Sequence, residues 1–328
     1  MVNVLHGPVD IAGQMGIYCK QLRKSGWTAN GYNWYRNYFQ YQSPIVQTDA
    51  YEIGKMILSV YQFADIVHFH NGSTFFKDFT DLSLLRKMGK KAVMHHWGND
   101  VRNVEAVNGE QAFKLPPSYY TWEEISRRLT LISSYIDTAI IQDHELYRYI
   151  APYYKNIYTL PLAIDASSIK HAVPSIHNNT PLIVHAPTNI EFKGTKYIES
   201  ALEKLRNHMK FIYKRIEKMS HREAMDWYMR SDIVIDQVLC GTYGLLSVEA
   251  MAMGKPVVAY IRDDLRPWFP KDLPIVSASP LQLEGVLGEL ITNPSLRHEL
   301  GRKGRQFVAG HHDVQVVMPQ LLRIYKEL

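Results

Sequence analysis

The sequence lacks several features that define whole classes of protein. It contains only two cysteines, too few for a disulfide framework or a cysteine-rich zinc site. No apolar run approaches the roughly 20 residues that cross a bilayer, and residues 1–13 lack the basic stretch, apolar run and cleavage site of a secretory signal. Internal repeats and low-complexity tracts are absent as well. We therefore expect a folded, cytoplasmic protein that does not span a membrane.

The composition indicates an ordinary globular protein with a mild excess of positive charge. The 328 residues are 46% hydrophobic and 21% charged, and at roughly 150 residues per domain this length suggests two domains. Thirty-seven lysines and arginines stand against 32 acidic residues, for a formal net charge of +5. This balance favours phosphates, other anionic ligands or an acidic membrane surface, without choosing among them.

Short apolar runs alternate with amphipathic stretches along the whole chain. The expected strands are 2–5, 66–69, 92–95, 139–142 and 158–162, then 182–185, 211–214, 233–236 and 257–260. The clearest helix has its apolar face at Ile53, Met56, Ile57, Val60, Tyr61 and Ala64. Ser220 and Glu223 have the spacing of a capping box, which predicts a helix start. Strands separated by helices predict doubly wound parallel sheets of the α/β class.

The polar segment 166–181 interrupts this alternation. Serine, asparagine, histidine and proline replace the apolar periodicity there, so we interpret it as a linker between two Rossmann-like domains. The first domain covers 1–165 and the second 182–310. Residues 311–328 are expected to form a C-terminal helix, for which packing back on the first domain is one arrangement. The carboxyl ends of both sheets then face one central cleft, where such sheets bind ligands.

The segment 232–260 has the pattern strand, glycine-bearing loop, helix, strand. Its loop ends at Gly244, and the amides of Leu245 and Leu246 open the helix, where hydrogen bonds and the helix dipole favour an anion. Glu249 lies just over one turn further on. A carboxylate repels a phosphate, so beside a phosphate site it binds neutral hydroxyls such as those of a ribose. The segment therefore indicates a nucleotide. An ordinary strand–loop–helix with a surface glutamate is the alternative.

This segment resembles the donor half of the retaining GT-B glycosyltransferases of family 4. Residues 244–258 follow the second part of the family motif, EGFGLxxxEAMAxGxPVV, without a gap. The first glutamate of that motif falls on Gly241, so its role toward the donor sugar is vacant or is taken by another residue. Asp236, at the end of the preceding strand, is our candidate.

The resemblance extends over nearly the whole chain. Residues 182–189 and 193–195 resemble the strand and KGT loop that open the family's donor domain, where an arginine and a lysine bind the diphosphate. Lys193 occupies the lysine position. No arginine lies on the loop before it, and we consider Lys196 and Arg215 as substitutes.

Three segments of the first domain also resemble the family. Gly13 matches the glycine loop beneath the reacting centre, residues 65–72 resemble DvvHxHg, and residues 95–100 resemble HGsD with Trp97 at the histidine position. Strand alternation puts His95 on the side of Trp97, so we favour His95 as the functional imidazole. A packed histidine pair is the alternative. The resemblance implies catalytic positions for His95, His96 and Gly13, and acceptor-side positions for His70, Trp97 and Asp100.

Metal binding finds little support in the sequence. The histidine pairs at 68 and 70, 95 and 96, and 311 and 312 lack accompanying cysteines or an HExxH helix. The sequence has no Asp-x-Asp motif, by which the metal-dependent GT-A transferases resemble one another. We therefore expect no metal and no cofactor, with lysine and helix amides supplying the positive charge.

The resemblance implies a glycosyltransferase that moves a sugar from a nucleoside diphosphate sugar to an acceptor hydroxyl with retention of configuration. The expected donor-binding residues are Lys193, Asp236, Gly244, Leu245, Leu246 and Glu249. The acceptor is a glycan, a lipid-linked compound or a small molecule; no nucleic acid is expected, and peripheral contact with an anionic membrane is compatible with the charge. A nucleotide-sugar epimerase of the same fold and a noncatalytic nucleotide- or glycan-binding protein are the alternatives.

Aromatic residues make up 12% of the chain and cluster at residues 31–41. Most such rings pack with their polar edges hydrogen-bonded, but a cluster of this kind also holds sugar rings or lipid head groups. We favour packing, and note that the cluster falls in the half of the chain that should meet the acceptor.

Overall fold

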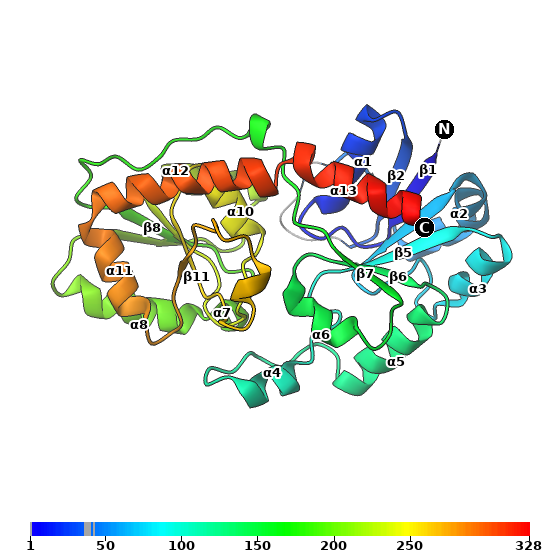
Figure 1. Ribbon diagram of the computed structural model, residues 1–328, viewed down its shortest axis with the longest axis horizontal. Coiled ribbons are helices and arrows are strands. Elements are labelled where there is room, and N and C mark those ends of the chain that lie inside the picture. The colour runs from blue at the N-terminus through cyan, green and yellow to red at the C-terminus, as the bar shows by residue number, and fades with distance from the viewer. Residues whose placement is uncertain (1, 36–40, 42) are drawn as a thin grey trace.

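The chain folds as two α/β domains, each built on one parallel sheet (Figure 1). A computed structural model describes residues 2–35, 41 and 43–328. The first sheet has the order β3-β2-β1-β4-β5-β6-β7, and every pair in it is parallel. Its strands are β1 (Asn3–Gly7), β2 (Thr28–Asn33), β3 (Val46–Gln47), β4 (Ile66–His70), β5 (Lys91–His96), β6 (Thr138–Ile141) and β7 (Asn156–Thr159). The predicted doubly wound α/β class is confirmed for this domain.

Helices connect the strands of the first sheet. They are α1 (Gln14–Lys24), α2 (Ala50–Phe63), α3 (Thr80–Lys87), α4 (Val104–Glu110), α5 (Trp122–Ser133) and α6 (Tyr147–Ile150), with a short 3-10 turn, η1 (His144–Leu146). Helix α2 begins at the Asp49 cap and buries Ile53, Ile57 and Tyr61 as its periodicity predicts. Met56 is an exception, since its side chain is exposed at the edge of that face.

The second sheet has the order β12-β11-β10-β8-β9 and is also parallel. Its strands are β8 (Leu182–His185), β9 (Ile212–Arg215), β10 (Ile233–Ile235), β11 (Val257–Ala259) and β12 (Val276–Ser277). The helices are α7 (Ile190–Lys193), α8 (Thr195–Arg206), α9 (His221–Arg230), α10 (Leu245–Ala252), α11 (Leu283–Thr292) and α12 (Pro294–His311), with the 3-10 turn η3 (Arg266–Trp268). The capping box of Ser220 and Glu223 at the start of α9 is formed.

The chain passes between the domains twice. The first passage contains the 3-10 turn η2 (Ala166–Ser168) and continues as an irregular segment to β8. The second follows α12, and the last helix, α13 (Val314–Glu327), then lies over the first domain against α1 (Figure 1). Tyr325 of α13 is fully buried there, with its hydroxyl 2.6 Å from Nδ1 of His68. Among the described residues, no helix combines the length and the apolar character that crossing a membrane requires.

Polar and aromatic contacts fix the two domains against each other. The Thr242 hydroxyl of the second domain donates to Oδ2 of Asp143 in the first at 2.8 Å, and both side chains are buried. The guanidinium of Arg102, paired with Glu145 at 2.8 Å, lies 5.3 Å from the ring centre of Phe192. The first contact joins the loops after β6 and β10, and the second joins the loop after β5 to helix α7.

Candidate functional site

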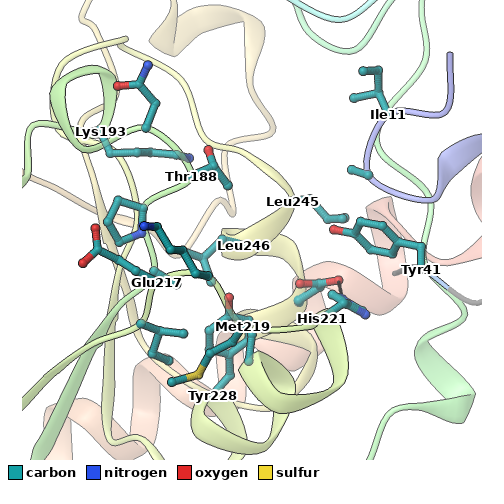
Figure 2. A pocket seen from close by; sticks show the side chains of 18 of the residues that line it. Ile11, Tyr41, Thr188, Lys193, Glu217, Met219, His221, Tyr228, Leu245 and Leu246 are labelled. Carbon is teal, nitrogen blue, oxygen red and sulfur yellow. Dashed lines mark hydrogen bonds and ion pairs between the residues drawn. The ribbon is translucent and has the colours of Figure 1, made fainter. Parts of the chain in front are cut away.

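A cleft of about 880 Å³ lies between the domains and is lined by both of them. Asp10, Ile11 and Tyr41 come from the first domain, and the second contributes the loops that follow β8 and β9 together with the start of α10. Figure 2 shows Thr188, Lys193 and Leu246 on one side of the opening, with Ile11 and Tyr41 opposite. Both sheets end at this cleft, where open parallel sheets bind ligands.

Lys193 reaches the cleft from the end of helix α7. Asn189 caps that one-turn helix, and Gly194, with φ 76°, ends it and leads directly into α8. The Nζ atom of Lys193 lies 2.6 Å from Oδ1 of Asp236 and 2.9 Å from Oε1 of Gln237. An ammonium group has three donors, so one N–H of Lys193 remains for an anion in the cleft.

Asp236 lies beneath the cleft and does not face it. Its carboxylate receives Lys193, the backbone amide of Gly244 at 3.0 Å and the hydroxyl of Ser247 at 2.7 Å. Burial alone would raise the pKa of Asp236, but these partners outweigh it and hold the pKa below its ordinary value. The expectation that Asp236 binds the donor sugar is therefore corrected: with both oxygens engaged and no exposed surface, Asp236 orients Lys193 and the glycine loop.

Helix α10 presents its first turn to the cleft. Gly244 is its N-cap residue, no side chain caps it, and Leu245 and Leu246 both line the cleft. Its first backbone amides and the positive end of its dipole are therefore directed toward the same space as Lys193. Together they form an anion-binding arrangement built from two separate elements.

Gly241 explains the absence of the first glutamate of the family motif. Its φ of 89° lies in the left-handed region, and a Cβ atom there would come 2.8 Å from Cβ of Arg262. The backbone carbonyl of Gly241 also accepts the amide of Arg262 at 3.0 Å. A glutamate at this position would be strained and would collide with Arg262.

Glu249 lines the cleft one turn into α10 and has a partner that the sequence analysis missed. Its Oε1 lies 2.6 Å from Nε2 of His221, the first residue of α9. The ring of His221 in turn packs on Tyr41 of the first domain, with ring centres 4.5 Å apart. Burial lowers the pKa of His221, but the hydrogen bond and charge of Glu249 outweigh that effect and raise it overall. The only sequence indication was the capping box, which places residue 221 at a helix start.

The candidates for a substitute arginine do not line the cleft. Arg215 forms ion pairs with Glu199 and Glu217 at 3.0 and 2.8 Å, and the ammonium of Lys196 lies 4.8 Å from the ring centre of Tyr197. Of the described residues, Lys193 and Lys218 are the lysines at the cleft wall, and no arginine lines it. Lys218 is thus the basic residue best placed to accompany Lys193.

His95 is buried under the first domain's side of the cleft. It has no exposed surface, its Nδ1 lies 3.3 Å from Nε2 of His68, and its ring stacks on Trp97 with centres 4.0 Å apart. His70 is equally buried and lies 3.1 Å from Nδ1 of His6. None of these three side chains lines the cleft. In this structure His95, His70 and Trp97 therefore have no direct access to a ligand in the cleft.

The buried histidines form a continuous network. His6 and His68 both reach the hydroxyl of Tyr325, at 3.3 and 2.6 Å, and link onward to His70 and His95. Burial lowers the pKa of all four histidines, to about 3 for His6, so they are neutral. His6, His68 and His70 are close enough to share a metal ion, but no carboxylate or cysteine joins them among the described residues, and most of their nitrogens are already bonded.

His96, Asp100 and Gly13 shape the loops around the cleft. His96 points to the other face of the sheet, where Nδ1 meets Oδ2 of Asp100 at 2.7 Å and Nε2 meets the hydroxyl of Tyr154 at 2.9 Å. Gly13, with φ 71°, is the N-cap of α1, and a Cβ atom there would come 2.9 Å from the ring of Tyr41. These contacts are structural: Gly13 makes room for Tyr41, and Asp100 holds the turn after β5 through the amides of Trp97 and Gly98.

The fold defined by these two domains is that of the GT-B glycosyltransferases. Residues 193–323 match the model of a glycosyl transferase-like family. No curated protein matches the chain in sequence.

Solved structures match the whole chain at low sequence identity. Sucrose-phosphate synthase from Thermosynechococcus elongatus aligns with a TM-score of 0.70 and 12% identity over 100% of this chain and 99% of its own. HepE of Anabaena, in complex with UDP-glucose, aligns with a TM-score of 0.70 and 11% identity over 100% of both chains. WaaG, a glycosyltransferase of lipopolysaccharide biosynthesis, aligns with a TM-score of 0.56 and 13% identity over 94% of this chain and 95% of its own.

Proposed function

We propose that this protein is a glycosyltransferase that moves a sugar from a nucleoside diphosphate sugar to an acceptor hydroxyl, with retention of configuration and without a metal ion. The observation that carries the proposal is the convergence of Lys193, the first turn of α10 and Glu249 on one wall of the interdomain cleft. The family match over residues 193–323 and the UDP-glucose bound to a HepE structure of the same fold support it.

The donor occupies the second-domain wall in this proposal. The diphosphate lies against the remaining N–H of Lys193 and the amides of Leu245 and Leu246. The ribose hydroxyls donate to Glu249, whose Oε1 is held by His221 and whose Oε2 remains for the ligand. Lys218 adds a second positive charge at the same wall.

Catalysis comes from charge stabilisation at the leaving phosphate. As the bond between the sugar and the phosphate lengthens, negative charge builds on the phosphate oxygens. Lys193 is held in place by Asp236 and Gln237 before any ligand binds, so it stabilises the transition state more than the ground state at no cost in reorganisation. The departing phosphate takes the proton of the acceptor hydroxyl, and no protein nucleophile is required.

A noncatalytic nucleotide-binding protein is the second candidate, and Gly241 is the observation that favours it. The acid that the related enzymes carry at this position cannot be accommodated here. Because Lys193, the first turn of α10 and Glu249 nevertheless line one wall of the cleft, we prefer the transferase.

A thermal-shift screen tests the proposal. UDP-glucose, UDP-N-acetylglucosamine, GDP-mannose and ADP-glucose are compared, because a ligand that binds only the native state raises its melting temperature. At least one of them should stabilise the wild type and fail to stabilise Glu249→Ala. If none shifts the melting temperature, neither the transferase nor the nucleotide-binding protein is supported.

A further inference from the structure

We infer that the acceptor is an uncharged glycan, bound by hydroxyl-to-carboxylate hydrogen bonds and tyrosine rings on the first-domain wall of the cleft. This inference rests on the proposed function, because it assigns the half of the cleft that the donor leaves open. The polar groups of that wall are Asp10, Tyr35, Tyr41, Asn99 and Tyr119.

The charges of the cleft are divided between its walls. Lys193 and Lys218 lie on the second-domain wall, whereas the described residues of the first-domain wall include one carboxylate, Asp10, and no lysine, arginine or histidine. A phosphate or carboxylate on the acceptor would meet Asp10, and the described residues of this wall offer no cation to balance the two negative charges, which costs binding energy. An uncharged polyol is not repelled by Asp10, and its hydroxyl groups can donate hydrogen bonds to the carboxylate.

Asp10 is held as part of a built site. Its Oδ1 accepts the amide of Met15 at 3.0 Å, and its side chain is nearly buried at the cleft wall. The buried side chain of Asn33 accepts the amides of both Asp10 and Tyr35, at 2.9 and 3.1 Å. One asparagine at the end of β2 thereby fixes a carboxylate and a tyrosine next to each other.

The tyrosines give this wall the chemistry of a sugar-binding surface. Tyr41 packs between Gly13 and His221, at the junction with the donor wall. Tyr35 and Tyr119 are exposed at the rim, Tyr119 to 85%. A large aromatic ring left so exposed gains from contact with the apolar face of a ligand, and its hydroxyl can still bond to water or sugar. The wall therefore combines flat apolar surfaces with hydrogen-bonding groups, which matches a sugar ring.

Matched pairs of acceptors test the inference. Nucleoside diphosphate release from the four donors of the thermal-shift screen is measured with neutral p-nitrophenyl glycosides and neutral oligosaccharides, and with the corresponding uronides and 6-phosphates. We expect neutral acceptors to stimulate release at least tenfold more than their anionic counterparts. A preference for the anionic acceptors, or donor binding with no stimulation by any neutral acceptor, overturns the inference while leaving the donor site intact. If no donor binds at all, the proposed function itself fails.

Two variants locate the acceptor. Asp10→Asn should lower kcat/KM for the neutral acceptor about tenfold and leave the KM for the donor unchanged, whereas an anionic acceptor would gain from the same change. Tyr119→Ala should raise the acceptor KM about fivefold, the size of one aromatic contact, with little effect on folding because the side chain is exposed. Tyr51→Ala is its control, since Tyr51 is 72% exposed on α2, away from the cleft. Equal effects of Tyr119→Ala and Tyr51→Ala would contradict the assignment.

Discussion

The ammonium of Lys193 and the carboxylate of Asp236 form a partly buried ion pair of 2.6 Å across the loops that follow β8 and β10. Asp236 also holds the amide of Gly244, so one carboxylate fixes both the cation and the helix start that face the cleft. Removing the charge of Asp236 should therefore affect stability and turnover together.

Asp236→Asn is expected to lower kcat ten- to hundredfold and to destabilise the fold by about 3 kcal/mol, because Lys193 is left partly buried without its counter-ion. Steady-state kinetics and denaturant titration measure the two effects. The control is Asp137→Asn, which disrupts an exposed pair with Lys155 of 2.8 Å and should change neither. Full activity of Asp236→Asn would show that Lys193 does not depend on this pair.

Glu249→Ala should weaken the binding of the nucleoside diphosphate ten- to hundredfold. The carboxylate lines the cleft and is already oriented by His221, so its loss removes an acceptor that needs no rearrangement. Isothermal titration calorimetry with UDP, GDP and ADP measures the change. Glu203→Ala, on the exposed surface of α8, is the matched control. An unchanged dissociation constant for Glu249→Ala would remove the ribose role.

Gly241→Glu, which restores the acid of the family motif, should destabilise the protein and not activate it. The left-handed backbone and the 2.8 Å approach of Arg262 should together lower the free energy of unfolding by about 2 kcal/mol or more. The control is Gly285→Ala, inside α11 with open space around it, which should raise stability by about 0.5–1 kcal/mol. A gain in activity by Gly241→Glu at an unchanged melting temperature would show that a glutamate fits at this position and contributes to the reaction.

Stability should fall steeply as the pH drops below 6.5. The pKa of each of six buried histidines, His6, His68, His70, His95, His185 and His312, is lowered by burial from 6.5, to about 3 for His6 and about 4 for His185 and His312. The folded state keeps them neutral while the unfolded state takes up protons, so the stability present above pH 6.5 is lost toward the folded pKa values, at about 2 kcal/mol by pH 5 for each of His6, His185 and His312. Burial raises the pKa of Asp10 and Asp143 to about 6, which offsets part of this loss.

Urea unfolding between pH 8 and pH 5 measures this dependence. The free energy of unfolding should be nearly constant from pH 8 to pH 7 and should fall by several kcal/mol toward pH 5, a large part of the stability of a typical protein. A stability that is equal at pH 5 and pH 8 would show that these histidines are not buried in the neutral form.

Much of the secondary structure can be predicted from the periodicity of the apolar residues, and the strands that are missed have physical reasons. Strand β8 is predicted at its exact bounds, because a four-residue apolar run between turn residues has few alternatives. Strand β2 is missed because Thr28–Asn33 contains little apolar character, although its residues 28–31 pair with β1. The aromatic cluster at 31–41 begins in that strand, and residues 36–40 of the cluster lie outside the described part of the chain.

The residues of the candidate site also fall into those that the sequence predicts and those that it does not. The strand–loop–helix pattern predicts that Leu245, Leu246 and Glu249 face a ligand, since helix phase and N-terminal position are local properties. Local sequence patterns do not show how deeply a side chain is buried. Asp236 and His95 are therefore predicted at the cleft, whereas both are buried beneath it. His221 was missed for a related reason: its contact with Glu249 joins residues 28 positions apart, and no spacing rule reports such a pair.

Nucleoside diphosphate release from the donor that stabilises the protein, followed with and without an acceptor, separates a transferase from the alternatives. We expect release that depends on the acceptor and falls at least tenfold in Lys193→Ala, with a glycosylated product of retained anomeric configuration. Release without an acceptor would indicate a hydrolase, and conversion of the donor sugar without release an epimerase. Tight donor binding with neither release nor conversion would show that the protein is not a transferase.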